Sequence, residues 1–153
     1  FMELVKIVTA FTVAHTITLI LAALQIVTLP PRFIECGIAV TIMYVAAENL
    51  WTKRASHRWM LTFAFGLVHG FGFANVLRAL GLPATGLARS LLSFNVGVEI
   101  GQIIIVAALW PLAWWLNRQT WDRKGKIGAS VVIFLFGLAW FIERASGLKF
   151  MPF

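Results

Sequence analysis

Five long hydrophobic stretches, separated by short polar segments, follow one another along the chain. Each can supply the roughly 20 residues that cross about 30 Å of hydrocarbon at about 1.5 Å per residue. The pattern predicts five transmembrane helices, over residues 4–27, 33–51, 59–80, 88–115 and 127–142. The expected fold class is therefore all-α, a polytopic transmembrane helix bundle in which residues 1–153 form a single domain.

Helix-breaking residues set the expected ends of these helices. Pro30 and Pro31 predict the end of the first helix, because proline has no N–H to donate and disfavours helix at the residue before it. Gly81, followed two residues later by Pro83, predicts the end of the third helix. Pro111 is expected to kink the end of the fourth.

Composition supports lipid as the solvent of this chain. Hydrophobic residues make up 60% and charged residues 12%, against roughly 45–50% and about 25% in an average soluble domain. The net charge of +7 does not indicate a nucleic-acid partner, because the charges lie between the hydrophobic runs rather than in one stripe. Cys36 is the only cysteine, which excludes an internal disulfide and a cysteine-based zinc or iron–sulfur cluster.

The basic residues predict an orientation in the membrane. With five spans, eight of the 13 lysines and arginines fall on the side of the chain's start and five on the other. Because cytoplasmic loops carry the excess of positive charge, the start is expected in the cytoplasm and the end outside it. Six of the seven tryptophans lie on the same side, where indoles anchor helices at the headgroups: Trp51, Trp59, Trp110, Trp114, Trp115 and Trp121.

Away from the outer ends of the predicted spans, four His and Glu residues stand out, because a charge inside the membrane is costly and by default indicates function. His15, His69 and Glu99 each lie about 15–17 Å into their helices, close to the midplane of a ~30 Å core. This common depth predicts one shared site in which the three side chains face one another. Glu48 lies nearer the cytoplasmic end of its helix.

Amides and glycines extend this pattern. Asn95, Glu99 and Gln102 are spaced i, i+4 and i+7, which places them on one stripe of the fourth helix. Two small-x-x-x-small patterns, Gly66 to Gly70 and Gly97 to Gly101, permit close approach of helices in lipid. Each pattern brackets one of the polar candidates, so both are expected to bring helices together.

These residue types favour a divalent first-row metal. Two imidazoles with one or two carboxylates suit nickel, cobalt or zinc, whereas copper(I) fits poorly without cysteine or a methionine array. His57 lies in the basic loop and is interpreted as a solvated residue. The chain has no Gly-x-Ser-x-Gly elbow, no His-Glu-x-x-His and no phosphate-binding glycine loop, so no catalytic residue is assigned.

Four stretches around these residues resemble the HupE/UreJ membrane proteins, which are related to nickel permeases. They are residues 4–19, 47–50, 65–74 and 94–102, and they touch four of the five predicted helices. The resemblance implies a multi-pass protein of the bacterial inner membrane with a role in transition-metal transport. Members usually carry a further upstream helix with a Gly-x-Asp-His element, which has no counterpart here, and we therefore expect the chain to be truncated.

Three functions follow as hypotheses. The first is a secondary transporter or permease for nickel or cobalt, and the second is an intramembrane hydrolase that uses zinc to activate water. The third is an accessory or scaffold subunit, and a homo-oligomer is compatible with all three. In the first hypothesis Asn95 and Gln102 support the midplane ligands, and Glu48 stands at one end of the path. The expected metal-binding residues are His15, His69, Glu99, Glu48, Asn95 and Gln102.

Overall fold

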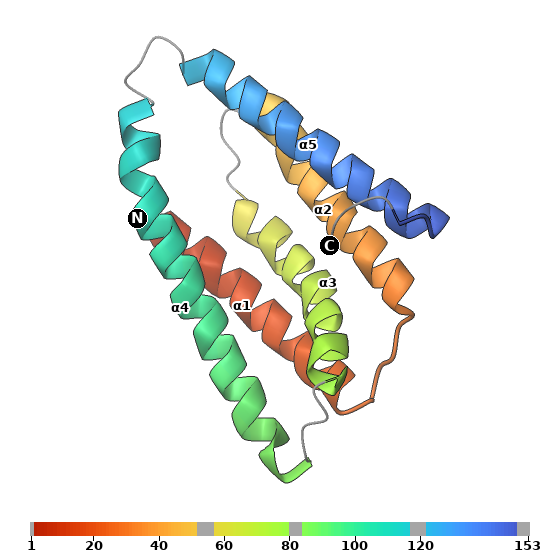
Figure 1. The fold of residues 1–153 in the computed structure, drawn as a ribbon. Coiled ribbons are helices and arrows are strands. Elements are labelled where there is room, and N and C mark those ends of the chain that lie inside the picture. Colours follow the sequence, from red (N-terminus) through yellow and green to blue (C-terminus); the bar gives the residue numbers. More distant parts are fainter. Residues whose placement is uncertain (1, 52–56, 80–83, 117–121, 150–153) are drawn as a thin grey trace. The chain divides into compact units, whose positions relative to one another are not determined.

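The computed structural model describes residues 2–51, 57–79, 84–116 and 122–149 of the chain. These residues form five helices and no strand, which confirms the all-α fold class. The helices are α1 (Met2–Ala23), α2 (Pro31–Trp51), α3 (Arg58–Ala79), α4 (Ala84–Leu116) and α5 (Asp122–Ser146). Figure 1 shows them in chain order from red to blue.

Helix α1 ends earlier than its prolines predict, because a local capping motif stops it first. The N–H of Ile26 donates to the carbonyl of Leu21 at 3.0 Å, and that of Gln25 donates to Ala22 at 3.1 Å. This is the Schellman pair of hydrogen bonds, which needs a left-handed residue. Gln25 supplies it with a φ of 59°, at a position where glycine is usual.

The other described ends follow known terminal signals. Pro31 is the first residue of α2, a position where its missing N–H has no intrahelical partner to lose. Gly147 ends α5 in the left-handed region, with a φ of 76°, and its N–H donates to Glu143 at 2.9 Å. Helix α4 continues through Pro111 to a length of 33 residues. The predicted stop signals Gly81 and Pro83 lie outside the described residues.

Four of the five described helices are long and apolar enough to cross a membrane, namely α1, α2, most of α4 and most of α5. Helix α3 has 22 residues, the same length as α1, and it is as apolar as α2. Its sequence carries two arginines, a histidine, an asparagine and three glycines among the hydrophobic residues. The chain is therefore a helical membrane protein.

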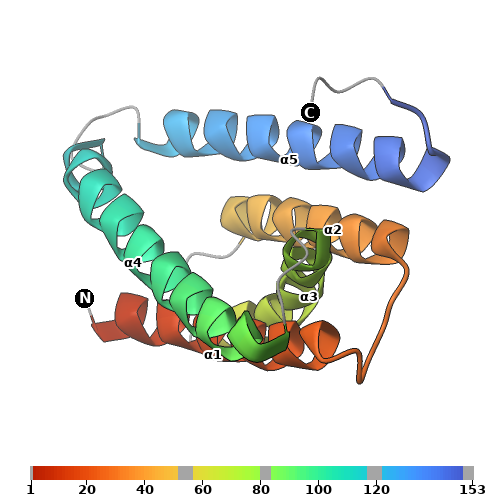
Figure 2. The same cartoon turned by 60° about the horizontal axis from the view of Figure 1, so that its bottom comes forward.

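The contacts divide the chain into two compact units, which we describe separately. The first comprises residues 1–34 and 57–107, and the second comprises residues 35–56 and 108–153. In the first unit α1 packs closely along α3 (Figures 1 and 2). Contacts of Gly66 with Phe11 and of Gly70 with Leu19 show that the two helices run in the same direction.

In the second unit α2 and α5 run in opposite directions. Near the start of α2, Glu35 forms an ion pair of 3.0 Å with Arg144 in the last turn of α5. Further along, a Cβ added at Gly137 would lie 2.9 Å from the Met43 side chain and 3.4 Å from the carbonyl of Ala39. The glycine therefore lets α5 approach α2, and the ion pair closes the same interface at its end.

Candidate metal-binding site

His15 is the centre of the first unit. It is 1% exposed and one of the two largest fully buried side chains of the described residues. Its Nδ1 lies 3.1 Å from Oδ1 of Asn95 on α4, which is itself 7% exposed. The imidazole of α1 and the amide of α4 therefore form a buried interhelical hydrogen bond.

The orientation of the Asn95 amide determines which nitrogen of His15 carries the proton. Nδ2 of Asn95 donates to the carbonyl of Leu91 at 2.9 Å, so Oδ1 must face the imidazole. An amide oxygen only accepts hydrogen bonds, and Nδ1 of His15 is therefore the protonated nitrogen. Nε2 of the neutral ring is then a bare lone pair, and it is buried without any hydrogen-bond partner in the described structure.

Phenylalanine rings surround this imidazole. Phe11 and Phe94 stack on it with centroid distances of 5.9 Å and 6.1 Å, and Phe73 meets it edge-on at 5.6 Å. The Phe11 ring also contacts His69, edge-on at 5.4 Å. The two histidines predicted to share a site therefore contact the same phenyl ring.

The sequence alone does not assign these aromatic residues to the site. A signal was present, because Phe11 precedes His15 by four residues and Phe73 follows His69 by four, which puts each pair on one helix face. Phe94 directly precedes Asn95. The pattern is common in any apolar helix, so only the packed structure identifies the enclosure.

Two glycines of α3, one on each side of His69 in the sequence, let α3 contact α1 at the level of His15. A Cβ at Gly66 would lie 2.5 Å from the carbonyl oxygen of Phe11, and one at Gly70 would collide with the His15 carbonyl and the Thr18 hydroxyl. The backbones of α1 and α3 therefore touch at this level, as the first glycine pattern predicts. Gly97 and Gly101 of α4 meet no atom within 4 Å in the described part of the molecule, so the second pattern forms no interface there.

A second polar contact lies about one turn away along α1. Oγ1 of Thr12 is 3.3 Å from Oε1 of Gln102, and it also lies 3.1 Å from the Val8 carbonyl. Since Thr12 precedes His15 while Gln102 follows Asn95, α1 and α4 run in opposite directions. Asn95 and Gln102, predicted as supporting ligands, thus both contact side chains of α1.

The carboxylates do not join this arrangement. Glu99 is half-buried and makes no hydrogen bond or ion pair with any described residue. Among residues 2–51, 57–79, 84–116 and 122–149, no three His, Cys, Asp or Glu side chains form a group that could hold a metal ion. Here the structure differs from the expected meeting of His15, His69 and Glu99. The register of α4 turns Asn95 toward His15, and Glu99 lies one helical turn further along.

Glu48 belongs to the second unit. It is half-buried on α2, near the end of that helix, and like Glu99 it makes no hydrogen bond or ion pair with a described residue. Its expected place at one end of a metal path stays a prediction.

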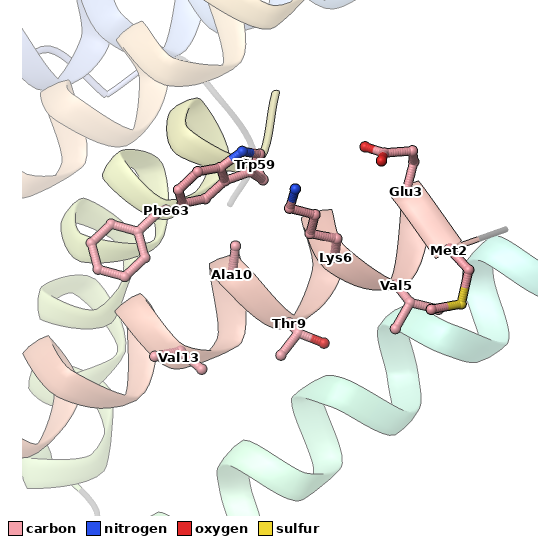
Figure 3. Close-up of a pocket in the computed structure, with 9 residues that line it drawn as sticks. All are labelled: Met2, Glu3, Val5, Lys6, Thr9, Ala10, Val13, Trp59 and Phe63. Carbon is pink, nitrogen blue, oxygen red and sulfur yellow. The ribbon is translucent and has the colours of Figure 1, made fainter. Parts of the chain in front are cut away.

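A separate pocket opens at the beginning of α1 and α3 (Figure 3). It has a volume of about 520 Å³, and its polar edge includes Lys6, whose Nζ lies 5.3 Å from the centre of the Trp59 ring. Its other lining residues are Met2, Glu3, Val5, Thr9, Ala10, Val13 and Phe63. The α1 residues of this pocket lie on the helix face away from His15, and the pocket contains none of the predicted metal ligands.

Comparison with protein families agrees with the resemblance seen in the sequence. The family described as HupE / UreJ protein matches residues 1–144 of the 153-residue chain. The chain belongs to the HupE/UreJ family. No curated protein and no solved structure matches it significantly.

The stretches that carry the HupE/UreJ resemblance meet in space. Residues 4–19 lie in α1, residues 65–74 in α3 and residues 94–102 in α4, all within the first unit. Between them they supply His15, Asn95 and the three phenylalanines that contact the imidazole. The fourth stretch, residues 47–50, lies in α2 of the second unit.

Proposed function

We propose that this HupE/UreJ protein is a permease for nickel or cobalt, and that Nε2 of His15 binds the metal ion as substrate. The observation that carries the proposal is the buried lone pair of that nitrogen, which has no hydrogen-bond partner in the described structure. A buried acceptor without a partner costs about 1–3 kcal/mol. An ion bound at this atom would supply the missing partner, and imidazole nitrogen is a preferred ligand of nickel, cobalt and zinc.

The surroundings of His15 favour transport over tight storage. The imidazole is enclosed by the apolar rings of Phe11, Phe73 and Phe94. An ion bound at Nε2 would therefore lose hydration water and gain few protein ligands in its place. Conduction requires binding that is weak enough to permit release. His69, in contact with Phe11, is the next imidazole beyond this ring and is proposed as the second ligand along the path.

The hydrolase hypothesis has less support. A catalytic zinc site uses three protein ligands and keeps a fourth position for water. The part of the chain that the structure describes contains no group of three suitable side chains. We therefore favour transport over hydrolysis, and we propose that the chain acts in the bacterial inner membrane with its start in the cytoplasm.

Metal uptake by cells that produce single-residue variants tests the proposal. His15→Ala and His15→Gln remove the imidazole nitrogen, and we expect uptake of radioactive nickel or cobalt to fall to the level of cells without the protein. His57→Ala is the matched control, because His57 is an exposed histidine directly before α3. Uptake is compared at equal abundance of folded protein in the membrane. Wild-type uptake by both His15 variants would refute the assignment of this nitrogen.

A further inference from the structure

We infer that Asn95 is a positioning residue that fixes the tautomer of His15 and so aims the bare Nε2 at the substrate. Sequence spacing places Asn95 among the metal ligands, but the structure uses both of its polar atoms within the protein. Nδ2 donates to the Leu91 carbonyl at 2.9 Å, and Oδ1 accepts from Nδ1 of His15 at 3.1 Å. The inference rests on the proposed function and extends it, since it states how the ligand nitrogen is presented.

The alternative tautomer is disfavoured by the same geometry. If Nε2 carried the proton, the lone pair of Nδ1 would face the lone pairs of Oδ1, and both acceptors would lose their partner. Rotation of the amide does not relieve this, because it would turn Oδ1 toward the Leu91 carbonyl and Nδ2 away from it. Both groups are buried, at 1% and 7% exposure, so water does not replace the lost hydrogen bond.

The consequence is a choice of substrate class. The side-chain oxygen of Asn95 already accepts a hydrogen bond from His15, whereas Nε2 of His15 has no partner in the described structure, so an ion at this level first meets the nitrogen lone pair. Hard cations such as Mg²⁺ and Ca²⁺ require several oxygen ligands, whereas nickel and cobalt accept imidazole nitrogen. In metal sites, a hydrogen bond to the far nitrogen fixes the tautomer and ring orientation of a histidine ligand in this way.

Nitrogen NMR of the metal-free protein measures the tautomer directly. The chain has three histidines, so ¹⁵N-histidine labelling gives few signals, and single substitutions of His57 and His69 assign them. In phosphatidylcholine nanodiscs, we expect a protonated Nδ1 and a bare Nε2 for His15 in the wild type. Asn95→Leu removes the acceptor and should abolish this preference.

Two further variants make the measurement specific. Gln102→Leu is the matched control, because it removes a second polar contact between α1 and α4 and leaves the partner of His15 in place. Its His15 signals should match the wild type. Asn95→Asp keeps an acceptor oxygen, so Nδ1 should keep its proton in this variant, which also decides the question if Asn95→Leu does not fold.

The outcomes separate this inference from the proposed function. Wild-type His15 signals in Asn95→Leu, or a bare Nδ1 in Asn95→Asp, would overturn the positioning role. If the tautomer changes as expected, nickel uptake by Asn95→Leu should fall about 10–100-fold, the usual cost of losing an outer partner of a metal ligand. A changed tautomer with wild-type uptake would leave the positioning role intact and refute metal binding by His15.

Discussion

The proposed activity depends on a single atom, Nε2 of His15, which is buried without a hydrogen-bond partner in the described structure. The sequence identifies His15 as unusual, because an ionisable side chain in a hydrophobic span requires a reason. It does not identify its partner, since Asn95, Glu99 and Gln102 share one stripe of α4 and any of them could face α1. The register between the two helices decides this, and it depends on packing across 80 residues of chain.

Glu99 provides a test of charge at the residue scale. The substitution Glu99→Gln keeps the size of the side chain and removes the negative charge that offsets a divalent cation. Since Glu99 makes no hydrogen bond or ion pair with a described residue, the variant should fold normally. Glu99 lies outside the described contacts of His15, but a carboxylate in a protein interior can attract a passing divalent cation by more than about 1.4 kcal/mol, so we expect metal accumulation to fall about ten-fold or more.

Glu99→Leu is the companion variant for this measurement. Uptake is measured for both at equal membrane abundance. A structural glutamate would behave differently, because Gln would preserve uptake and Leu would mainly reduce the amount of folded protein. Wild-type uptake by Glu99→Gln would therefore remove Glu99 from the metal path and leave the two histidines as its polar groups.

At the scale of helices, the hydrophobic pattern predicts the number and order of elements, and local signals refine their ends. Helix α1 is predicted to reach Val27 but ends at Ala23, because the capping hydrogen bonds around Gln25 precede the proline signal. The two glycine patterns look equivalent in sequence. In the described structure, the pattern of Gly66 and Gly70 contacts another helix and that of Gly97 and Gly101 does not. The pattern permits a close approach, but it does not determine which face of a helix another helix covers.

This difference predicts opposite effects of adding a methyl group. Gly70→Ala places a Cβ against the backbone carbonyl of His15 and the Thr18 hydroxyl, so α1 and α3 must separate. We expect a loss of stability of about 1–3 kcal/mol, the usual cost of overpacking, and reduced metal uptake. Thermal unfolding of the detergent-solubilised protein measures the first effect.

Gly97→Ala is the matched control on α4. A Cβ there meets nothing within 4 Å in the described structure, and alanine is the better helix former. Its unfolding temperature should equal or exceed that of the wild type. A loss of stability as large as that of Gly70→Ala would show that Gly97 faces a helix or a second copy that the described contacts do not include.

At the scale of the whole molecule, helix directions agree with successive crossings of a membrane. In the first unit α1 and α3 run in the same direction and α4 runs opposite to α1, and in the second unit α2 and α5 are opposed. Alternate spans require these relations. Helix α3 is thus placed as a span by its packing against α1 and by its length of 22 residues. The single domain predicted for residues 1–153 stays a prediction.

The orientation of these spans is the remaining prediction at this scale. Eight of the 13 lysines and arginines lie on the side of the chain's start, so residues 53–58 and 118–126 are expected in the cytoplasm. Cys36→Ser gives a cysteine-free background. Single cysteines are then introduced as His57→Cys and Gly125→Cys on the expected inner side, and as Leu148→Cys, at an exposed position, on the outer side.

A membrane-impermeant maleimide reports which cysteines face outward in intact cells. We expect it to label Leu148→Cys before permeabilisation and the two others only afterwards, because the excess of positive charge resists translocation. The three variants control one another. Labelling of Leu148→Cys shows that the reagent reacts in intact cells, and labelling of the two others shows that it enters after permeabilisation. The reverse pattern would place the basic loops outside. His15 would then take up its ion along α1 from the opposite face, while its contacts with Asn95 and the phenylalanines would be unchanged.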